Sequence, residues 1–333
     1  MAWGLPDPKP MEKIPEINIY ENVERVSEIH LDGLVLLQII KHANDHSPKV
    51  VTGSLLGMEN DDVLEITQSF ANPDPEKEGI DGNAFQMDMM HNLKEVNMDN
   101  NKIGWYQSTS MGAFCSLDVV ENQFQYQENM GPNAVCVTYD PTETRNGKLA
   151  LKAFRLTEAF YDEYKKGAFK SESVTTNEIA SETIFEEIPI KLHNTELVNC
   201  WLLENVQDAG AFDRLDLSTS EYLENKVSNL AAWCDELAQE HYKFQNYERN
   251  CHKQKSHYAQ WISKRKEENK LRTEKGIEHL PETDAVLSKV VNPPSRLESL
   301  LITKQIRSYC DDINDAAGQS FEKLDLMKKL QSL

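Results

Sequence analysis

Cys115 and His91 are the residues that could pair as a catalytic nucleophile and its general base. A thiol becomes reactive where a neighbouring base or positive charge lowers its pKa, and no cluster of activating charge is visible around either residue. The six cysteines are widely spaced and form no C-x-x-C pair, so neither a zinc finger nor a disulfide scaffold is expected. We therefore predict that Cys115 is structural and that the chain occupies a reducing compartment.

The stretch GWYQSTSMGAFCSLDVV, residues 104–120, keeps the frame of a metal-binding loop without its ligands. It resembles the loop of the MPN-domain isopeptidases, in which GWYHSHPG supplies two histidines and a later aspartate completes the zinc site. In active members of that family a glutamate also stands at the first position of the stretch that reads VVTGSLLG here, at 50–57. Other residues stand here at the ligand and general-base positions: Val50, Gln107, Thr109, Leu117 and Val120.

These replacements remove the chemistry that the resemblance would otherwise imply. A catalytic zinc needs about three protein ligands and one open position for water. An amide and an alcohol at positions 107 and 109 are poor ligands, and Val50 cannot act as a general base. Asp118 lies two residues from the expected aspartate position, and one carboxylate cannot form the site. We predict no bound metal, no cofactor and no hydrolytic activity.

The composition narrows the function further. The 333 residues predict about two domains. A net charge of −20 disfavours broad electrostatic binding to nucleic acid as the main activity. The start, MAWGLPDPKPMEK, lacks the apolar core of a signal peptide, and the longest largely apolar stretch, 33–40, is too short to span a membrane. We expect a cytoplasmic protein with no membrane contact.

The elements that must position the loop belong to an α/β or α+β domain. Alternation of apolar residues and turn signals predict strands at 26–31, 49–56, 63–70, 102–107, 134–139 and 149–156. A helix capped by Asp32 is predicted at 33–46, largely buried, with Leu34 and Leu37 near one face. A second helix is predicted at 85–96, where Met87, Met90 and Val96 have the spacing of a core face. The expected fold is an MPN domain with a central mixed β-sheet flanked by helices, followed by a C-terminal helical bundle or coiled-coil region.

The C-terminal third carries two apolar seams with heptad spacing. The first seam holds Leu223, Val227, Leu230, Leu237 and Phe244, with Cys234 and His241 at the remaining positions. The second seam holds Ile302, Ile306, Tyr309 and Ile313. Buried aliphatic side chains stabilise an interface by about 1.5–3 kcal/mol each, so we expect both seams to be interfaces. The predicted organisation is a disordered tail (1–23), an MPN domain (24–160), a connection with a short strand and helix (161–217), a long helix (218–272), a linker (273–295) and a C-terminal helix (296–333).

The chain also resembles, over nearly its whole length, the h-subunit family of eukaryotic translation initiation factor three. The resemblance is carried by DGLVLLQIIKHAN (32–44), VNMDNNKIGWYQST (96–109) and SLLITKQIRSYCDDI (299–313), among other segments. It implies a noncatalytic subunit that pairs with the f subunit through MPN domains, joins PCI-domain subunits through its C-terminal helices, and supports 43S and 48S preinitiation complexes and mRNA recruitment on the small ribosomal subunit. The alternatives are an inactive MPN scaffold of a proteasome-lid or signalosome-like complex, and a metal-dependent isopeptidase with an unusual site.

The segment 253–275 is a basic exception in an acidic chain. It has two interpretations, a solvated helix end and a contact with ribosomal or messenger RNA. Under the second interpretation Lys264, Arg265 and Lys266 would contact phosphates, while Tyr258 and Trp261 would stack on bases. The sequence leaves both interpretations open.

Overall fold

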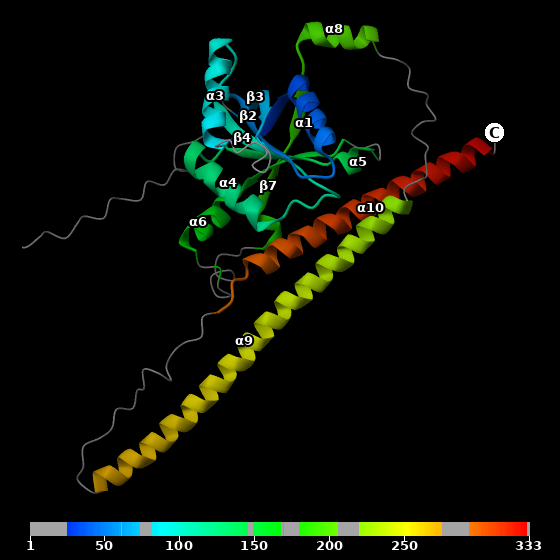
Figure 1. The fold of residues 1–333 in the computed structure, drawn as a ribbon. Coiled ribbons are helices and arrows are strands. Elements are labelled where there is room, and N and C mark those ends of the chain that lie inside the picture. The colour runs from blue at the N-terminus through cyan, green and yellow to red at the C-terminus, as the bar shows by residue number, and fades with distance from the viewer. Residues whose placement is uncertain are drawn as a thin grey trace, which may run out of the picture.

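The computed structural model describes residues 25–60, 62–73, 82–145, 149–167, 169, 180–205, 220–274 and 293–331. The predicted tail at 1–23 and most of the predicted linker at 273–295 lie outside the described residues. Figure 1 shows a β-sheet with helices packed around it and two long helices that cross beside it.

The elements follow one another along the chain as a mixture of strands and helices. The strands are β1 (Glu28–Asp32), β2 (Thr52–Asn60), β3 (Val63–Ala71), β4 (Lys102–Ser108), β5 (Val135–Tyr139), β6 (Leu151–Leu156), β7 (Phe185–Ile188) and β8 (Ile190–His193). The helices are α1 (Gly33–His46), α3 (Gly82–Glu95), α4 (Leu117–Met130), α5 (Pro141–Arg145), α6 (Glu158–Lys166), the short η1 (Ser181–Thr183), α8 (Glu196–Asn205), α9 (Ser220–Glu274) and α10 (Leu297–Gln331).

The strands form one mixed sheet in the order β7-β6-β5-β4-β2-β3-β1-β8. β1 runs parallel to β3 and β8, and β4 runs parallel to β5, while the other neighbours are antiparallel. The first domain was predicted to end at residue 160, but β7 and β8 are the edge strands of this same sheet. The sheet therefore extends to His193, into the segment that was predicted to be a connection.

Helix α1 covers one face of the sheet. Asp32 caps it, because its Oδ1 accepts a hydrogen bond of 3.0 Å from the backbone N–H of Leu34. Its buried side chains are Val35, Ile39 and Ala43, which follow the i, i+4, i+8 spacing of a single helix face. The helix was expected to be largely buried, but Leu34 and Leu37 are 49% and 64% exposed. Their face points away from the sheet.

The opposite face of the sheet is covered by α4, α6 and the first turns of α10. Trp105 lies in this second core cluster, whereas its neighbour Tyr106 lies in the cluster under α1. The strand residues therefore point to opposite faces, as expected for a β-strand. Leu297 and Leu301 of α10 are buried in the same cluster as Trp105. The C-terminal helix is thus part of the domain core, which its sequence pattern did not predict.

The methionine face of α3 is exposed. Met87 is 69% exposed and Val96 is 68% exposed, although their spacing predicted a core face. The helix stands at the side of the sheet (Figure 1) and places Met90 in a surface cleft of about 400 Å³ that Met130 also lines. The expectation that these methionines form core is therefore wrong for the described structure.

Helices α9 and α10 run antiparallel and pack on each other (Figure 1). The guanidinium of Arg296, just before α10, lies 3.4 Å from the centre of the Phe244 ring. At the other end of the contact, Lys226 of α9 meets Asp312 of α10. Because α10 begins opposite Phe244, the rest of α9 extends beyond it, and the last turns of α10 extend past the start of α9.

The seam of α9 is rotated from the one that the sequence predicts. Leu223, Leu230, Leu237 and Phe244 are half-buried, as expected for one row of the seam. The second row was predicted at Val227, Cys234 and His241, but all three are exposed. The row that faces α10 instead holds Lys226, Trp233, Glu240 and Tyr247, each three residues after a member of the first row. On α10, Ile302 and Tyr309 are buried, while Ile306 and Ile313 are half-buried.

Candidate functional site: the loop after β4 and its joint with the C-terminal helices

Three of the five replaced positions meet at one end of the sheet. Gln107 pairs with Thr52 of β2 and with Thr138 of β5. The backbone N–H of Ser108 donates to the carbonyl of Val51 at 2.8 Å, and the Ser108 hydroxyl accepts from the N–H of Val51 at 2.8 Å. Val50, which is exposed, therefore lies beside the strand end that carries Gln107 and Thr109.

The other two positions lie on the first turns of α4. Ser116 caps this helix, since its hydroxyl accepts from the backbone N–H of Val119 at 3.4 Å. Leu117 is exposed, and Val120 is fully buried in the core cluster that contains Trp105. Val120 thus contributes to packing, and a charged side chain at that position would be buried without a partner.

The loop between β4 and α4 is organised around Asp140. The backbone N–H of Gly112 donates to Oδ2 of Asp140, and the N–H groups of Thr142 and Glu143 donate to Oδ1 at 2.7 and 3.1 Å. The Thr109 hydroxyl lies 3.5 Å from the same carboxylate. The only buried aspartate among the described residues is therefore held by backbone donors. No group of three or more histidine, cysteine, aspartate or glutamate side chains in the described ranges is arranged to hold a metal ion.

Cys115 and His91 are not brought together. Cys115 is buried, and burial raises the pKa of its thiol to about 12, so the thiol stays protonated. His91 lies exposed on α3, where it is 3.3 Å from Glu95. The prediction that Cys115 is structural agrees with this placement.

Gln305 of α10 fixes the conformation of the loop. Its Oε1 accepts hydrogen bonds from the backbone N–H groups of Phe114 and Cys115, at 3.2 and 3.0 Å. Its Nε2 donates to the carbonyl of Gly112 at 2.8 Å. The Gln305 side chain is fully buried, so these three bonds have no competition from solvent. The segment that binds metal in active MPN isopeptidases is here tied to the C-terminal helix.

A buried charge cluster forms the second part of this joint. Nζ of Lys226, on α9, is 2.9 Å from Oδ2 of Asp312 on α10 and donates to Oε1 of Glu143 on α5. The same ammonium lies 4.5 Å from the centre of the Tyr309 ring, a cation–π contact. Lys226 is fully buried and joins three separate elements. Gly112 packs so closely here that a side chain at this position would meet the Lys226 ammonium.

The surroundings of Lys226 keep its ammonium charged. Burial alone would lower the pKa of Lys226, but the hydrogen bond to Glu143 and the charges of Glu143 and Asp312 outweigh it, and the pKa is raised. Burial raises the pKa of Glu143, and the charges of Asp312 and Asp140 add to this against the hydrogen bond from Lys226. Both directions follow from one cation among several carboxylates. Lys226 is therefore charged at physiological pH.

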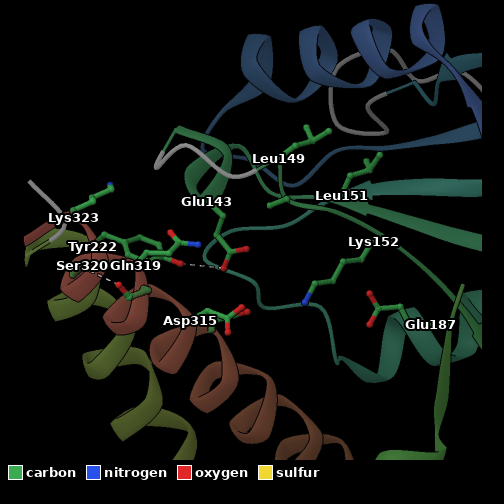
Figure 2. Close-up of a pocket in the computed structure, with 13 residues that line it drawn as sticks. Glu143, Leu149, Leu151, Lys152, Glu187, Tyr222, Asp315, Gln319, Ser320 and Lys323 are labelled. Carbon is green, nitrogen blue, oxygen red and sulfur yellow. Dashed lines mark hydrogen bonds between the residues drawn. The ribbon is translucent and has the colours of Figure 1, made fainter. Parts of the chain in front are cut away.

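A cleft of about 280 Å³ opens beside the joint, between β6 and α10. Figure 2 shows Lys152 and Glu187 on the side of the sheet domain, and Asp315 and Gln319 on the side of α10. The hydroxyl of Tyr222 donates to Glu143 at its edge, at 3.2 Å. Because the lining mixes both signs of charge, the cleft is a solvated groove beside the joint and not a site selective for one charged ligand.

Sequence reasoning missed the residues that make the joint. The heptad pattern does not single out Lys226, because lysines in such a pattern usually lie on the solvent face. Leu297, Leu301 and Gln305 follow a four-residue spacing on α10 that marks a second packed face, offset from the predicted seam. That spacing was the available signal. The candidate RNA-contact residues lie far from the joint, on the distal part of α9, where Lys264 and Lys266 are exposed and Arg265 is half-buried.

The sheet, the loop and the replaced metal positions define a protein of the MPN class. A family model described as JAB1/Mov34/MPN/PAD-1 ubiquitin protease matches residues 24–132, and a model described as the C-terminal region of eIF3h matches residues 144–333. A relative from Arabidopsis thaliana, the H subunit of eukaryotic translation initiation factor 3, is 42% identical, covering 91% of this chain and 92% of the relative. Relatives with the same name are 37% identical in Dictyostelium discoideum, covering 95% and 98%, and 38% identical in Xenopus tropicalis, covering 92% and 93%.

The chain belongs to the H-subunit family of eukaryotic translation initiation factor 3. The family resemblance inferred from the sequence is confirmed, and so is the predicted fold of an MPN domain followed by a C-terminal helical region. Among the described residues, no helix combines the length and the apolar character that crossing a membrane requires.

Proposed function

We propose that the chain is a noncatalytic assembly subunit of eukaryotic translation initiation factor 3. In this role it supports 43S and 48S preinitiation complexes and mRNA recruitment on the small ribosomal subunit, in the cytoplasm. Family membership supports the place in the initiation factor. The finer role rests on how the MPN loop is used.

The observation that carries the noncatalytic role is the contact of Gln305 with the loop after β4. Three hydrogen bonds from one buried side chain hold the backbone of Gly112, Phe114 and Cys115. The loop that would carry metal ligands in an isopeptidase serves here as a socket for α10. A socket of this kind fixes the direction of the long helices relative to the MPN domain, which is what an assembly subunit requires.

The outer faces of the long helices support contacts with PCI-domain subunits. Val227 is 52% exposed on the face of α9 that points away from α10, in one row with Cys234 and His241. Past the start of α9, the last turns of α10 expose four large apolar side chains: Phe321, Leu324, Leu326 and Leu330. An unpaired helix with such a surface favours packing against further helices. We therefore assign the predicted interface role of Val227 to contacts outside this chain.

The exposed face of α3 supports pairing with the other MPN subunit, the f subunit. Met87 and Val96 present large apolar surface beside the cleft lined by Met90 and Met130. Methionine side chains are flexible and adapt their shape to a partner. An exposed apolar surface of this kind is typical of a protein interface, and we assign it to a second MPN domain.

Cysteine accessibility tests the assembly role without removing any part of the chain. Cys234 and Cys310 are exposed on α9 and α10, and Cys200 is exposed on α8. A maleimide should label all three in the free protein, and assembly with the other subunits should protect Cys234, which lies in the Val227 row. Mass spectrometry gives the labelled fraction of each cysteine. Equal labelling of Cys234 in the free and assembled states would show that this face of α9 is not an interface.

Identification of copurifying subunits distinguishes the proposal from a proteasome-lid or signalosome scaffold. The full chain, tagged at one end, should recover initiation-factor subunits, including the f subunit and the PCI-domain subunits. Met87→Asp should selectively reduce recovery of the f subunit, because it places a charge on the α3 face. Asp88→Asn, on the neighbouring position of α3, serves as the control. Recovery of lid or signalosome subunits in place of initiation-factor subunits would refute the proposal.

A further inference from the structure

The distal part of α9 extends past the helix that packs on its first half. α10 begins opposite Phe244, where Arg296 stacks on the ring, and α9 continues to Glu274. Those 30 residues beyond Phe244 correspond to about 45 Å of helix. Figure 1 shows this end of α9, in yellow to orange, projecting away from the sheet domain. Within this part of α9 the side chains of Lys264, Lys266 and Lys270 are exposed, whereas Asn269 is buried.

This end of α9 has the opposite charge to the rest of the protein. Seven lysines and arginines and three glutamates lie between Lys253 and Glu274, in a chain whose net charge is −20. Lys264, Lys266 and Lys270 are exposed, and none of them forms an ion pair with a described residue. Free ammonium groups on a projecting helix are the chemistry that neutralises phosphates.

The aromatic residues of this segment are already stacked. The rings of Tyr258 and Trp261 lie 6.1 Å apart with an angle of 10° between their planes. One turn further along α9, the Arg265 guanidinium lies 4.8 Å from the centre of the Trp261 ring. A flat guanidinium and two nearly parallel rings form a platform on which unpaired bases can stack.

The heptad spacing of α9 can be followed into this segment, but the residues at the seam positions change from apolar to aromatic and basic. The row that carries Leu223, Leu230, Leu237 and Phe244 in the packed half continues through Cys251 and Tyr258 to Arg265 and Arg272. Two arginines in one seam are unfavourable in the core of a coiled coil. The pattern therefore disfavours a further apolar helix as the occupant and favours a polyanion.

We infer that the segment Lys253–Glu274 of α9 is an RNA-contact surface, in which Lys264, Lys266 and Lys270 contact phosphates and Tyr258 and Trp261 stack on bases. The occupant is single-stranded RNA, because stacking on side chains requires unpaired bases. This inference goes beyond the assembly role, because it assigns RNA binding to the chain itself and not to the assembled factor.

Fluorescence anisotropy with a labelled, unstructured RNA tests the inference on the full chain. Binding should weaken steeply between about 50 and 200 mM KCl. In the triple variant Lys264→Gln, Lys266→Gln, Lys270→Gln, affinity at the lower salt should fall at least about tenfold, and the slope of log K against log salt should flatten by about two. Trp261→Ala should weaken binding about tenfold and leave the slope unchanged.

A matched triple variant removes the same charge elsewhere. Lys41, Lys94 and Lys165 are exposed on the sheet domain, and their replacement by glutamine should leave affinity and slope close to those of the wild type. Circular dichroism verifies that each variant keeps its helix content. An unchanged slope in the first triple variant, or an equal loss in the matched one, would overturn the inference. If the first triple variant kept its RNA affinity but no longer copurified with a partner subunit, the inference would also be overturned, in favour of a protein-docking surface.

Discussion

Lys226 of α9 and Asp312 of α10 form an ion pair of 2.9 Å in which the lysine side chain is completely buried. The same ammonium reaches Glu143 in the sheet domain, so one cation links three elements that are far apart in the sequence. Ion pairs of this kind contribute little when compared with apolar packing, but they are costly to break from one side. That asymmetry makes Lys226 the most sensitive single position of the joint.

Lys226→Met should therefore lower the free energy of unfolding by about 3–5 kcal/mol, because two carboxylates then face each other without a cation. Chemical denaturation monitored by circular dichroism gives the value. Lys243→Met on the same helix is the control, since the ion pair of Lys243 with Glu240 is exposed on the lysine side and its loss should change the stability little. Adding Glu143→Gln and Asp312→Asn to Lys226→Met should recover part of the loss. Equal stability of the two single variants would contradict the buried cluster.

Gln305→Ala should destabilise the protein by about 1–3 kcal/mol, since it leaves two N–H groups and one carbonyl of the loop without partners. Hydrogen exchange should accelerate at the amides of Phe114 and Cys115, which donate to Gln305. Gln319→Ala, at an exposed position of the same helix, should change neither quantity. Unaltered exchange at the two loop amides in Gln305→Ala would mean that the glutamine does not hold the loop.

The purified protein should contain no stoichiometric zinc and should not cleave ubiquitin chains. Elemental analysis and a chain-cleavage assay measure the two properties. The double variant Gln107→His, Thr109→His should stay inactive, because Val50 supplies no general base and Val120 no carboxylate. Adding Val120→Asp should reduce stability, since Val120 is fully buried. One zinc per wild-type chain, removable by a chelator, would refute the noncatalytic assignment.

The pair of Arg155 and Glu186 should give a measurable pH dependence. A hydrogen bond of 2.8 Å from the Arg155 guanidinium lowers the pKa of Glu186 below its ordinary value of 4.5. The stabilisation is therefore present above pH 4.5 and lost as the pH falls through the lowered pKa. Because Glu186 is partly exposed, Glu186→Gln should cost only about 0.2–1 kcal/mol at neutral pH.

The difference between wild type and Glu186→Gln should shrink on acidification, as measured by denaturation at a series of pH values. Glu187→Gln is the control, since successive residues of β7 point to opposite faces and Glu187 is exposed. If the difference in unfolding free energy between wild type and Glu186→Gln stayed constant down to the most acid pH, the lowered pKa would be contradicted.

The sequence predicted the sheet and the loop better than it predicted which helix faces are buried. The strand GWYQS was identified by its pattern, and Trp105 and Tyr106 do lie on opposite faces. Helix α1 is apolar on several sides, so its residues alone could not show that Val35, Ile39 and Ala43 face the sheet. Helical periodicity reports that a face exists, and tertiary contacts decide which of two apolar faces is covered.

The seam of α9 shows the same limit. Leu223, Leu230 and Leu237 fit a second row placed either three or four residues later. Val227 favoured the row four residues later, whereas in the structure Lys226 and Trp233 occupy the packed row. A buried lysine is predictable only when its carboxylates are known, and these come from segments about 80 residues away in each direction.

The three hydrogen bonds between Gln305 and the loop all involve main-chain atoms of the loop. The side chains of Met111 and Ala113 form none of these hydrogen bonds. Gly112 is different, because it has a φ of +78° and packs against the Lys226 cluster. A docking contact that depends on main-chain shape tolerates sequence drift around it, which allows ligand residues to be lost from such a loop while the attachment of the helix persists.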